Sequence, residues 1–205
     1  MKKGFKTLMI GLMAAGMLTA CSEESRLAKQ VTGSWASSPE RIADPSAISA
    51  SMVRILDFVK DSDSAGGQLV MSGLITVNST VNSTSPTINT PISYSASGVA
   101  TVQGEWAAHD DDEIILMLDP ATFNLQVDHQ AVVLDYNLID GNSQATTDSL
   151  KPALMTEVRA QMRRMVETQF FNAGKIDDIK VKDVMMSCEI DDRDVTFRRQ
   201  EGEAK

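Results

Sequence analysis

Apolar and polar residues alternate with a period of two over most of the chain, as they do in β-strands that bury one face. Gly, Asp, Asn and Pro residues separate successive runs and favour tight turns. The runs that predict strands are 31–35, 52–59, 68–77, 92–106, 114–118, 123–127, 131–138, 176–181, 184–190 and 195–199. The pattern therefore predicts a mainly β fold, an antiparallel barrel or strongly curved meander of about eight to ten strands.

The segment Ser49–Val59 fits two patterns. Its apolar residues also form a helical stripe behind Asp44–Pro45, which would serve as cap and first turn. However, its β-branched residues lead into the turn-rich stretch Asp61–Gly67, and a second strand-like run follows at 68–77. We predict a β-hairpin, followed at Asn78–Pro91 by a mobile loop or a polar edge.

Apolar residues recur every three or four positions between Ser149 and Asn172, which is the spacing of a helix with one buried face. Asp148 or Ser149 would cap this helix, Pro152 would fall in its first turn and Gly174 would follow its end. The pattern predicts one long amphipathic helix, about 149–172, packed on the sheet.

The first twenty residues have the parts of an export signal, with three lysines before an apolar run at 8–18. This run is too short to cross a bilayer, which takes roughly 20 apolar residues. Leu18–Cys21 resembles the lipobox that bacterial lipoprotein signal peptidase recognises. The resemblance implies a signal peptide at 1–20, acylation of Cys21 and a lipidated tether at 21–30, with the lipid bilayer as a partner.

The residues after the cysteine indicate a destination. Ser22 stands where the inner-membrane retention signal has an Asp, so we expect the outer membrane. The acidic stretch Ser22–Ser25 resembles the surface-export signal of some gut and oral Gram-negative anaerobes, which implies exposure on the cell surface. The alternative interpretation of this stretch is a solvated tether.

Charge and cysteine content narrow the partners further. The formal net charge is −9, and removal of 1–20, with three lysines and no acids, leaves about −12. Nucleic acid and anionic lipid surfaces are polyanions, so neither is expected as a partner. Once Cys21 is acylated, Cys188 is the single remaining thiol, so stability depends on packing rather than on an intramolecular disulfide.

The triplet Gly33-x-Trp35 near the start of this strand-rich region resembles the first strand of lipocalins and lipocalin-like lipoproteins. The resemblance implies a single calycin-like β-barrel domain at 31–205, in which Gly33 permits close approach and Trp35 plugs one end of the barrel. A helix before the final strands is also similar to these proteins. The alternative is a plain first strand with a buried tryptophan.

The candidate catalytic and metal-binding residues form no complete site. Asp61–Gly66 partly matches a calcium loop but has Ala65 at the third ligand position and Ser72 at the twelfth, where a bidentate Glu is needed. His109 and His129 are too few for a zinc site. We interpret the acidic runs Asp110–Glu113 and Asp191–Asp194 as solvated turns. No enzyme, metal or cofactor is therefore expected.

Two serines are candidates for modification. Asp63-Ser64-Ala65 and Asp148-Ser149-Leu150 resemble the three-residue O-glycosylation motif that the same anaerobes use on exported proteins. This resemblance implies glycosylation at Ser64 and Ser149.

Two functions fit these observations. The first is a non-enzymatic, lipocalin-like lipoprotein that binds a small apolar or amphipathic ligand in its barrel mouth, where cavities of such folds lie. The alternative is an envelope accessory or adhesion protein with a filled barrel and a protein-protein interface. Cavity volume separates them, because a ligand pocket takes roughly 300 Å3 or more.

Overall fold

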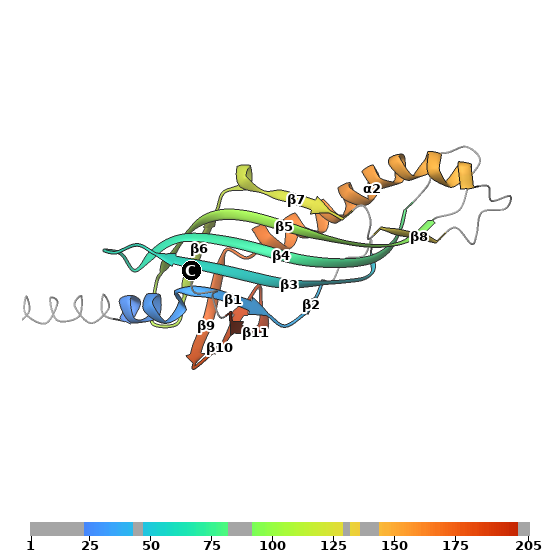
Figure 1. The fold of residues 1–205 in the computed structure, drawn as a ribbon. Helices are drawn as coiled ribbons and strands as arrows, with labels where there is room; N and C mark the ends of the chain where they lie inside the picture. The colour runs from blue at the N-terminus through green and yellow to red at the C-terminus, as the bar shows by residue number, and fades with distance from the viewer. Residues whose placement is uncertain (1–22, 43–46, 82–91, 129–131, 136–143, 201–205) are drawn as a thin grey trace, which may run out of the picture.

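The computed structural model describes residues 23–42, 47–81, 92–128, 132–135 and 144–200 (Figure 1). The predicted signal peptide and Cys21 lie outside these residues. The strands are β1 (Gly33–Ser37), β2 (Glu40–Arg41), β3 (Ala47–Lys60), β4 (Gly66–Val81), β5 (Ile92–Ala108), β6 (Ile114–Leu118), β7 (Asn124–Val127), β8 (Val133–Asp135), β9 (Lys175–Lys182), β10 (Met185–Ile190) and β11 (Arg193–Arg199). A 3-10 turn, η1 (Pro120–Thr122), precedes β7, and the long helix is α2 (Gln144–Phe171).

Eight strands form a closed antiparallel barrel in the order β1-β11-β10-β9-β6-β5-β4-β3. The strand that closes it is β1, which pairs with β11 on one side and β3 on the other. Trp35 accordingly lies opposite Arg199 in one ladder and opposite Leu56 in the other. The predicted fold class, a mainly β barrel with one long helix packed on it, is confirmed.

The strands β3, β4 and β5 are the longest, at 14, 16 and 17 residues, and β4 pairs with both neighbours along almost its whole length. The far side of β5 pairs in succession with β6, β7 and β8. The three long strands form a curved sheet that α2 follows along one side (Figure 1). The closed barrel and this curved sheet therefore share the same strands.

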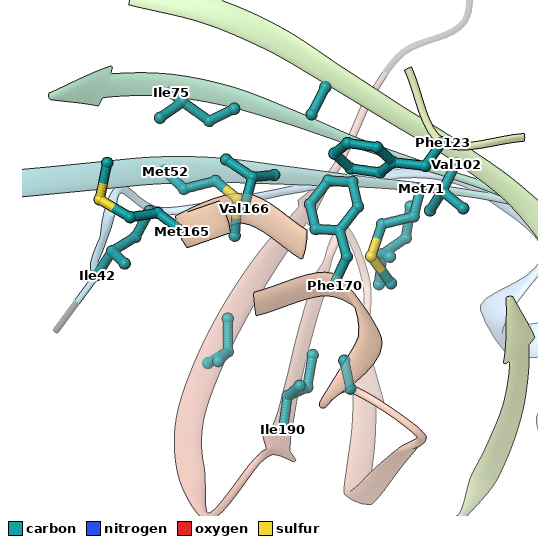
Figure 2. Packing of buried hydrophobic residues seen from close by; sticks show 14 of the residues in the cluster. Ile42, Met52, Met71, Ile75, Val102, Phe123, Met165, Val166, Phe170 and Ile190 are labelled. Carbon is teal, nitrogen blue, oxygen red and sulfur yellow. The ribbon is translucent and has the colours of Figure 1, made fainter. Parts of the chain in front are cut away.

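The inner face of the curved sheet is covered by α2. Met165, Val166 and Phe170 of the helix lie among buried residues of the sheet (Figure 2). Gly73 permits this approach, because a Cβ there would lie 3.1 Å from Cζ of Phe170 and 2.8 Å from Sδ of Met52. Each fully buried apolar side chain of this kind stabilises the fold by roughly 1.5–3 kcal/mol. The helix thus completes the core.

The segment Ser49–Val59 lies in β3, and β3 pairs with β4 from Ala47 opposite Ser79 to Lys60 opposite Gly67. The predicted hairpin is confirmed, and the alternative helix is wrong. The reason is visible in the burial pattern, which has a period of two. The inward positions are Ala50, Met52, Arg54, Leu56 and Phe58.

The predicted start of the long helix is wrong. The helix begins at Gln144 rather than Ser149, so neither Asp148 nor Ser149 is its cap, and Pro152 lies in its interior. Proline removes one backbone hydrogen bond from a helix. Pro152 is exposed, and the buried stripe that starts at Leu154 holds the following turns against the sheet.

The segment expected to be a tether is structured where it is described. Residues 23–31 are helical, and Leu27, Ala28 and Val31 are almost fully buried in the core. Leu27 and Ala28 lie four and three positions before Val31, so both are neighbours of Val31 on the same side of the helix. Val31, expected in the first strand, therefore belongs to this helix, and β1 begins at Gly33.

Arg199, near the chain end, fixes this N-terminal helix to the barrel. Its guanidinium carbon lies 4.1 Å from the ring centre of Trp35. Its Nη1 and Nη2 donate hydrogen bonds of 2.7 Å to the carbonyl oxygens of Thr32 and Gln30. Nε1 of Trp35 donates to the carbonyl oxygen of Val31. Three carbonyls that a helix C-terminus leaves unpaired are thereby satisfied.

Gly33 has to be a glycine in this arrangement. Its φ of +119° is a conformation that other residues rarely adopt, and a Cβ there would lie 2.8 Å from Nη1 of Arg199. Trp35 is fully buried beneath the guanidinium.

The substitution Arg199→Ala removes the ring contact and both hydrogen bonds. We expect the free energy of unfolding, measured in urea, to fall by about 2 kcal/mol. Arg198→Ala is the matched control, because Arg198 is an exposed neighbour in the same strand, and its effect should stay within about 0.5 kcal/mol. Equal losses in the two variants would contradict this role of Arg199.

Candidate functional site

The barrel wall changes at the point where β1 ends. β1 pairs with β11 as far as Ser37 opposite Phe197, and the N–H of Ser38 then donates to the carbonyl oxygen of Thr196. The next strand, β2, pairs with β3 alone. The first residues of β11 therefore face β2 without a backbone ladder between them.

A hollow of about 320 Å3 lies at this place, and we call it the seam hollow. It is lined by Ser38, Pro39, Glu40, Arg41, Arg193, Asp194, Val195 and Thr196. Six of the eight lining side chains are polar or charged, so the hollow is suited to a ligand with a polar group.

Arg54 lies behind the lining residue Glu40. In β3, residues 55–58 pair with β1 and residues 51–52 pair with β2, so Arg54 falls where the two partner strands separate. Its backbone N–H donates to Oγ of Ser37 at 2.9 Å, and that hydroxyl donates to the carbonyl oxygen of Ser38. A side chain thus replaces the missing ladder partner at this position.

The Arg54 side chain points into the barrel and is 0% exposed. Its Nη2 lies 3.5 Å from Oε2 of Glu40, whose side chain is 13% exposed. Charge-assisted hydrogen bonds of this type are usually about 2.7–2.9 Å long. Within the described part of the chain, none of the three guanidinium nitrogens has a hydrogen-bond partner, and neither has Oε1 of Glu40.

This arrangement leaves a buried cation poorly compensated. Burial lowers the pKa of Arg54, while the charge of Glu40 opposes that shift. Arg193 adds to the lowering, and Cys188 and Asp191 oppose it more weakly. A buried charge without hydrogen bonds costs several kcal/mol, so additional acceptors around this guanidinium would stabilise the protein.

Cys188 faces the same interior from β10. Burial raises the pKa of its thiol to about 12, against a smaller opposing effect of Arg54. Sγ donates to the carbonyl oxygen of Val195 at 3.8 Å. The group is a protonated, buried thiol at neutral pH and behaves as an apolar core residue.

The residues singled out in the sequence lie away from the seam hollow or outside the described residues. Ser64 is exposed in the turn between β3 and β4, and its hydroxyl donates to the carbonyl oxygen of Gly66. Ser149 lies in α2, but its side chain is outside the description, as are Cys21 and His129. Gly33 and Trp35 lie in β1, next to Arg199.

The two acidic runs lie near one lysine. The pKa of Lys175 is raised chiefly by its hydrogen bond with Asp177, and Glu113 and Asp192 contribute further. Across the described ranges, no group of three or more His, Cys, Asp or Glu side chains has an arrangement that could hold a metal ion. These acids therefore provide no candidate site.

A second hollow, of about 410 Å3, is lined by segments of β4 and β5 and by residues 126–128. Leu74 and Val99 lie opposite each other in the ladder there and are 47% and 41% exposed. The outer surface of the long strands thus carries an apolar pair beside a hollow.

The buried arginine behind the seam hollow, Arg54, was missed in the sequence. Arg54 has the same parity in β3 as Met52 and Leu56, which the alternation places on the inward face. A charged residue at an inward position was the signal that could have identified it.

No protein-family model matches this chain, and no curated protein sequence does either. The helices that the structure describes include none with the length and apolar character needed to cross a membrane.

The raised pKa of Cys188 makes its reactivity a test of barrel packing. In a chain that begins at Ser22, a thiol reagent at pH 8 should label Cys188 only after unfolding, because the thiolate fraction in the folded state is roughly one in ten thousand. Full labelling in denaturant is the control. Rapid labelling of the folded protein would contradict the buried position.

The raised pKa of Cys188 also makes the folding stability depend on pH. The folded-state pKa of Cys188 lies above the ordinary value of 9.0. The contribution of this group to folding stability is therefore fully present below about pH 9 and is lost as the pH rises toward 12.

Proposed function

We propose that this chain is a lipid-anchored, non-enzymatic protein of the bacterial cell envelope whose barrel binds a small amphipathic ligand at the seam hollow. Acylation of Cys21 supplies the anchor, the outer membrane is the location, and the barrel faces the cell surface. The closed β-barrel is compatible with ligand binding. The lipobox and the acidic residues after it support the location.

The observation that carries the ligand proposal is the seam hollow. Its volume of about 320 Å3 lies at the lower end of the range of small-molecule sites. Glu40, Arg41 and Arg193 offer polar contacts, whereas Pro39 and Val195 offer apolar ones. This mixture favours an amphipathic ligand over a wholly apolar one.

The interior of the barrel argues for a site at the wall. The buried residues of the strands and of α2 form one continuous core cluster, and Trp35, Trp106 and Phe58 are among its largest members. Where the structure is described, these side chains occupy the space that a hollow barrel would leave to a ligand. We therefore place the ligand at the seam hollow rather than in the barrel mouth, where it was expected from the sequence.

A filled barrel also favours the second candidate, an envelope accessory or adhesion protein. The exposed pair Leu74 and Val99 beside the outer hollow would then belong to a protein-protein interface. Large apolar side chains grouped on a surface are typical of such interfaces.

Native mass spectrometry of a chain that begins at Ser22, purified from a bacterial host, distinguishes the two candidates. The expected result is an extra mass of a small molecule that persists under native conditions and disappears on unfolding. A protein mass without any addition, at protein concentrations well above those of the host extract, would contradict ligand binding. The partner interface would then be the function to test.

A further inference from the structure

We propose that the guanidinium of Arg54 is an anion-binding group: the carboxylate or phosphate group of a ligand enters between β2 and β11 and takes the place of Glu40 beside it. This inference rests on the proposed function and names the chemical class of the ligand. Its basis is the buried Arg54 side chain behind the seam hollow, which has an ion pair with Glu40 but no hydrogen bond within the described residues.

The N–H donors of Arg54 have the geometry to bind an anion. Arginine presents five N–H donors in a planar fork that matches the oxygens of carboxylate and phosphate groups. Arg54 uses none of them in a hydrogen bond within the described residues, although its side chain is fully buried. An anion with two oxygens in the plane of this fork would satisfy two donors at once.

Glu40 now stands beside Arg54. The pair is separated by 3.5 Å and makes no hydrogen bond, so Glu40 neutralises the charge without satisfying the donors. Glu40 also lines the hollow and is the more exposed of the two side chains. It can therefore turn toward solvent when another anion arrives, whereas Arg54 cannot.

The hollow has other charges as well. Arg193 lines it too and lies near enough to affect Arg54, but its Nη2 already donates to Oε1 of Gln169 and lies 3.7 Å from Oδ2 of Asp191. Arg41 is exposed at the opposite wall. The charged lining residues balance, with Arg41 and Arg193 against Glu40 and Asp194, so the lining by itself favours neither sign of ligand. The preference for an anion comes from Arg54, whose guanidinium nitrogens have no hydrogen-bond partner within the described residues.

The test is isothermal titration calorimetry on the full-length chain, purified from bacterial membranes in a non-ionic detergent. The probes are hexanoate, its neutral counterpart hexanamide, and inorganic phosphate. We expect an anion to bind at least about tenfold more tightly than hexanamide, because charge-assisted hydrogen bonds are about twice as strong as neutral ones. Binding of hexanoate but not of phosphate would indicate that the ligand is an amphiphile with a carboxylate. Binding of phosphate but not of hexanoate would indicate that the ligand carries a phosphate group.

Two variants of the site make the test specific. Arg54→Met removes the cation with little change in volume, and Glu40, whose side chain is 13% exposed, can then turn toward solvent. If this variant fails to fold, Arg54→Met is made together with Glu40→Gln, because replacing both members of a buried ion pair is often neutral or stabilising. Anion affinity should fall at least about tenfold in it. Glu40→Gln removes the competing carboxylate and should raise anion affinity by about tenfold, with a larger rise in Tm on adding the anion.

Arg198→Met is the matched control, since it removes an exposed cation from β11 outside the hollow. Its affinity for the anion should equal that of the unchanged protein.

Several outcomes would overturn the inference. One is that hexanamide and hexanoate bind equally well. Another is that Arg54→Met binds the anion as tightly as the unchanged protein does. A third is that neither hexanoate nor phosphate binds to the unchanged protein or to Glu40→Gln. A native mass addition that persists in Arg54→Met would refute the anion site and leave the proposed ligand binding intact. The absence of any native mass addition bears on the proposed function instead.

Discussion

The barrel depends on one five-residue strand, β1, that pairs on both of its sides. The first and last strands that the structure describes, β1 and β11, pair there, and the helix at 23–31 leads directly into β1. The stacking of Arg199 on Trp35, with the hydrogen bonds of Arg199 to Gln30 and Thr32, holds this junction together. Contacts between residues so far apart in sequence require loop-closure entropy to be overcome, which is typical of slowly folding β-proteins.

The shortness of β1 also explains the candidate site. β3 has 14 residues, so a five-residue partner cannot cover it, and β2 takes over after a short break. Arg54 lies at that break, where Oγ of Ser37 receives its backbone N–H. The same discontinuity that opens the seam hollow therefore places the buried Arg54 beside Glu40, which lines the hollow.

The packing around α2 differs from the packing around Arg54. α2 fills the inner face of the curved sheet with apolar side chains, and glycine at position 73 removes the one Cβ that would obstruct Phe170. The region around Arg54 is instead polar and incompletely paired. A buried charge without hydrogen bonds in an otherwise well-packed core is a feature that a binding site explains.

Much of the architecture could be predicted from the sequence, because period-two alternation and the apolar stripe of α2 are local signals. The hairpin of β3 and β4 and the closing strands followed from them. The N-terminal helix could not be predicted, since its buried face consists of Leu27, Ala28 and Val31 in a short segment that begins with charged residues. The seam hollow could not be predicted either, because it depends on which strands pair, and the alternation of apolar and polar residues does not determine strand pairing. Arg54 was detectable only as an inward charge whose partners lie elsewhere in the chain.

A crystal structure of the protein grown in the presence of hexanoate tests anion binding by Arg54 most directly. We expect a carboxylate oxygen within about 3 Å of a guanidinium nitrogen of Arg54, with Glu40 turned toward solvent. A structure in which Glu40 forms two short hydrogen bonds to Arg54 and no anion lies in the seam hollow would contradict it.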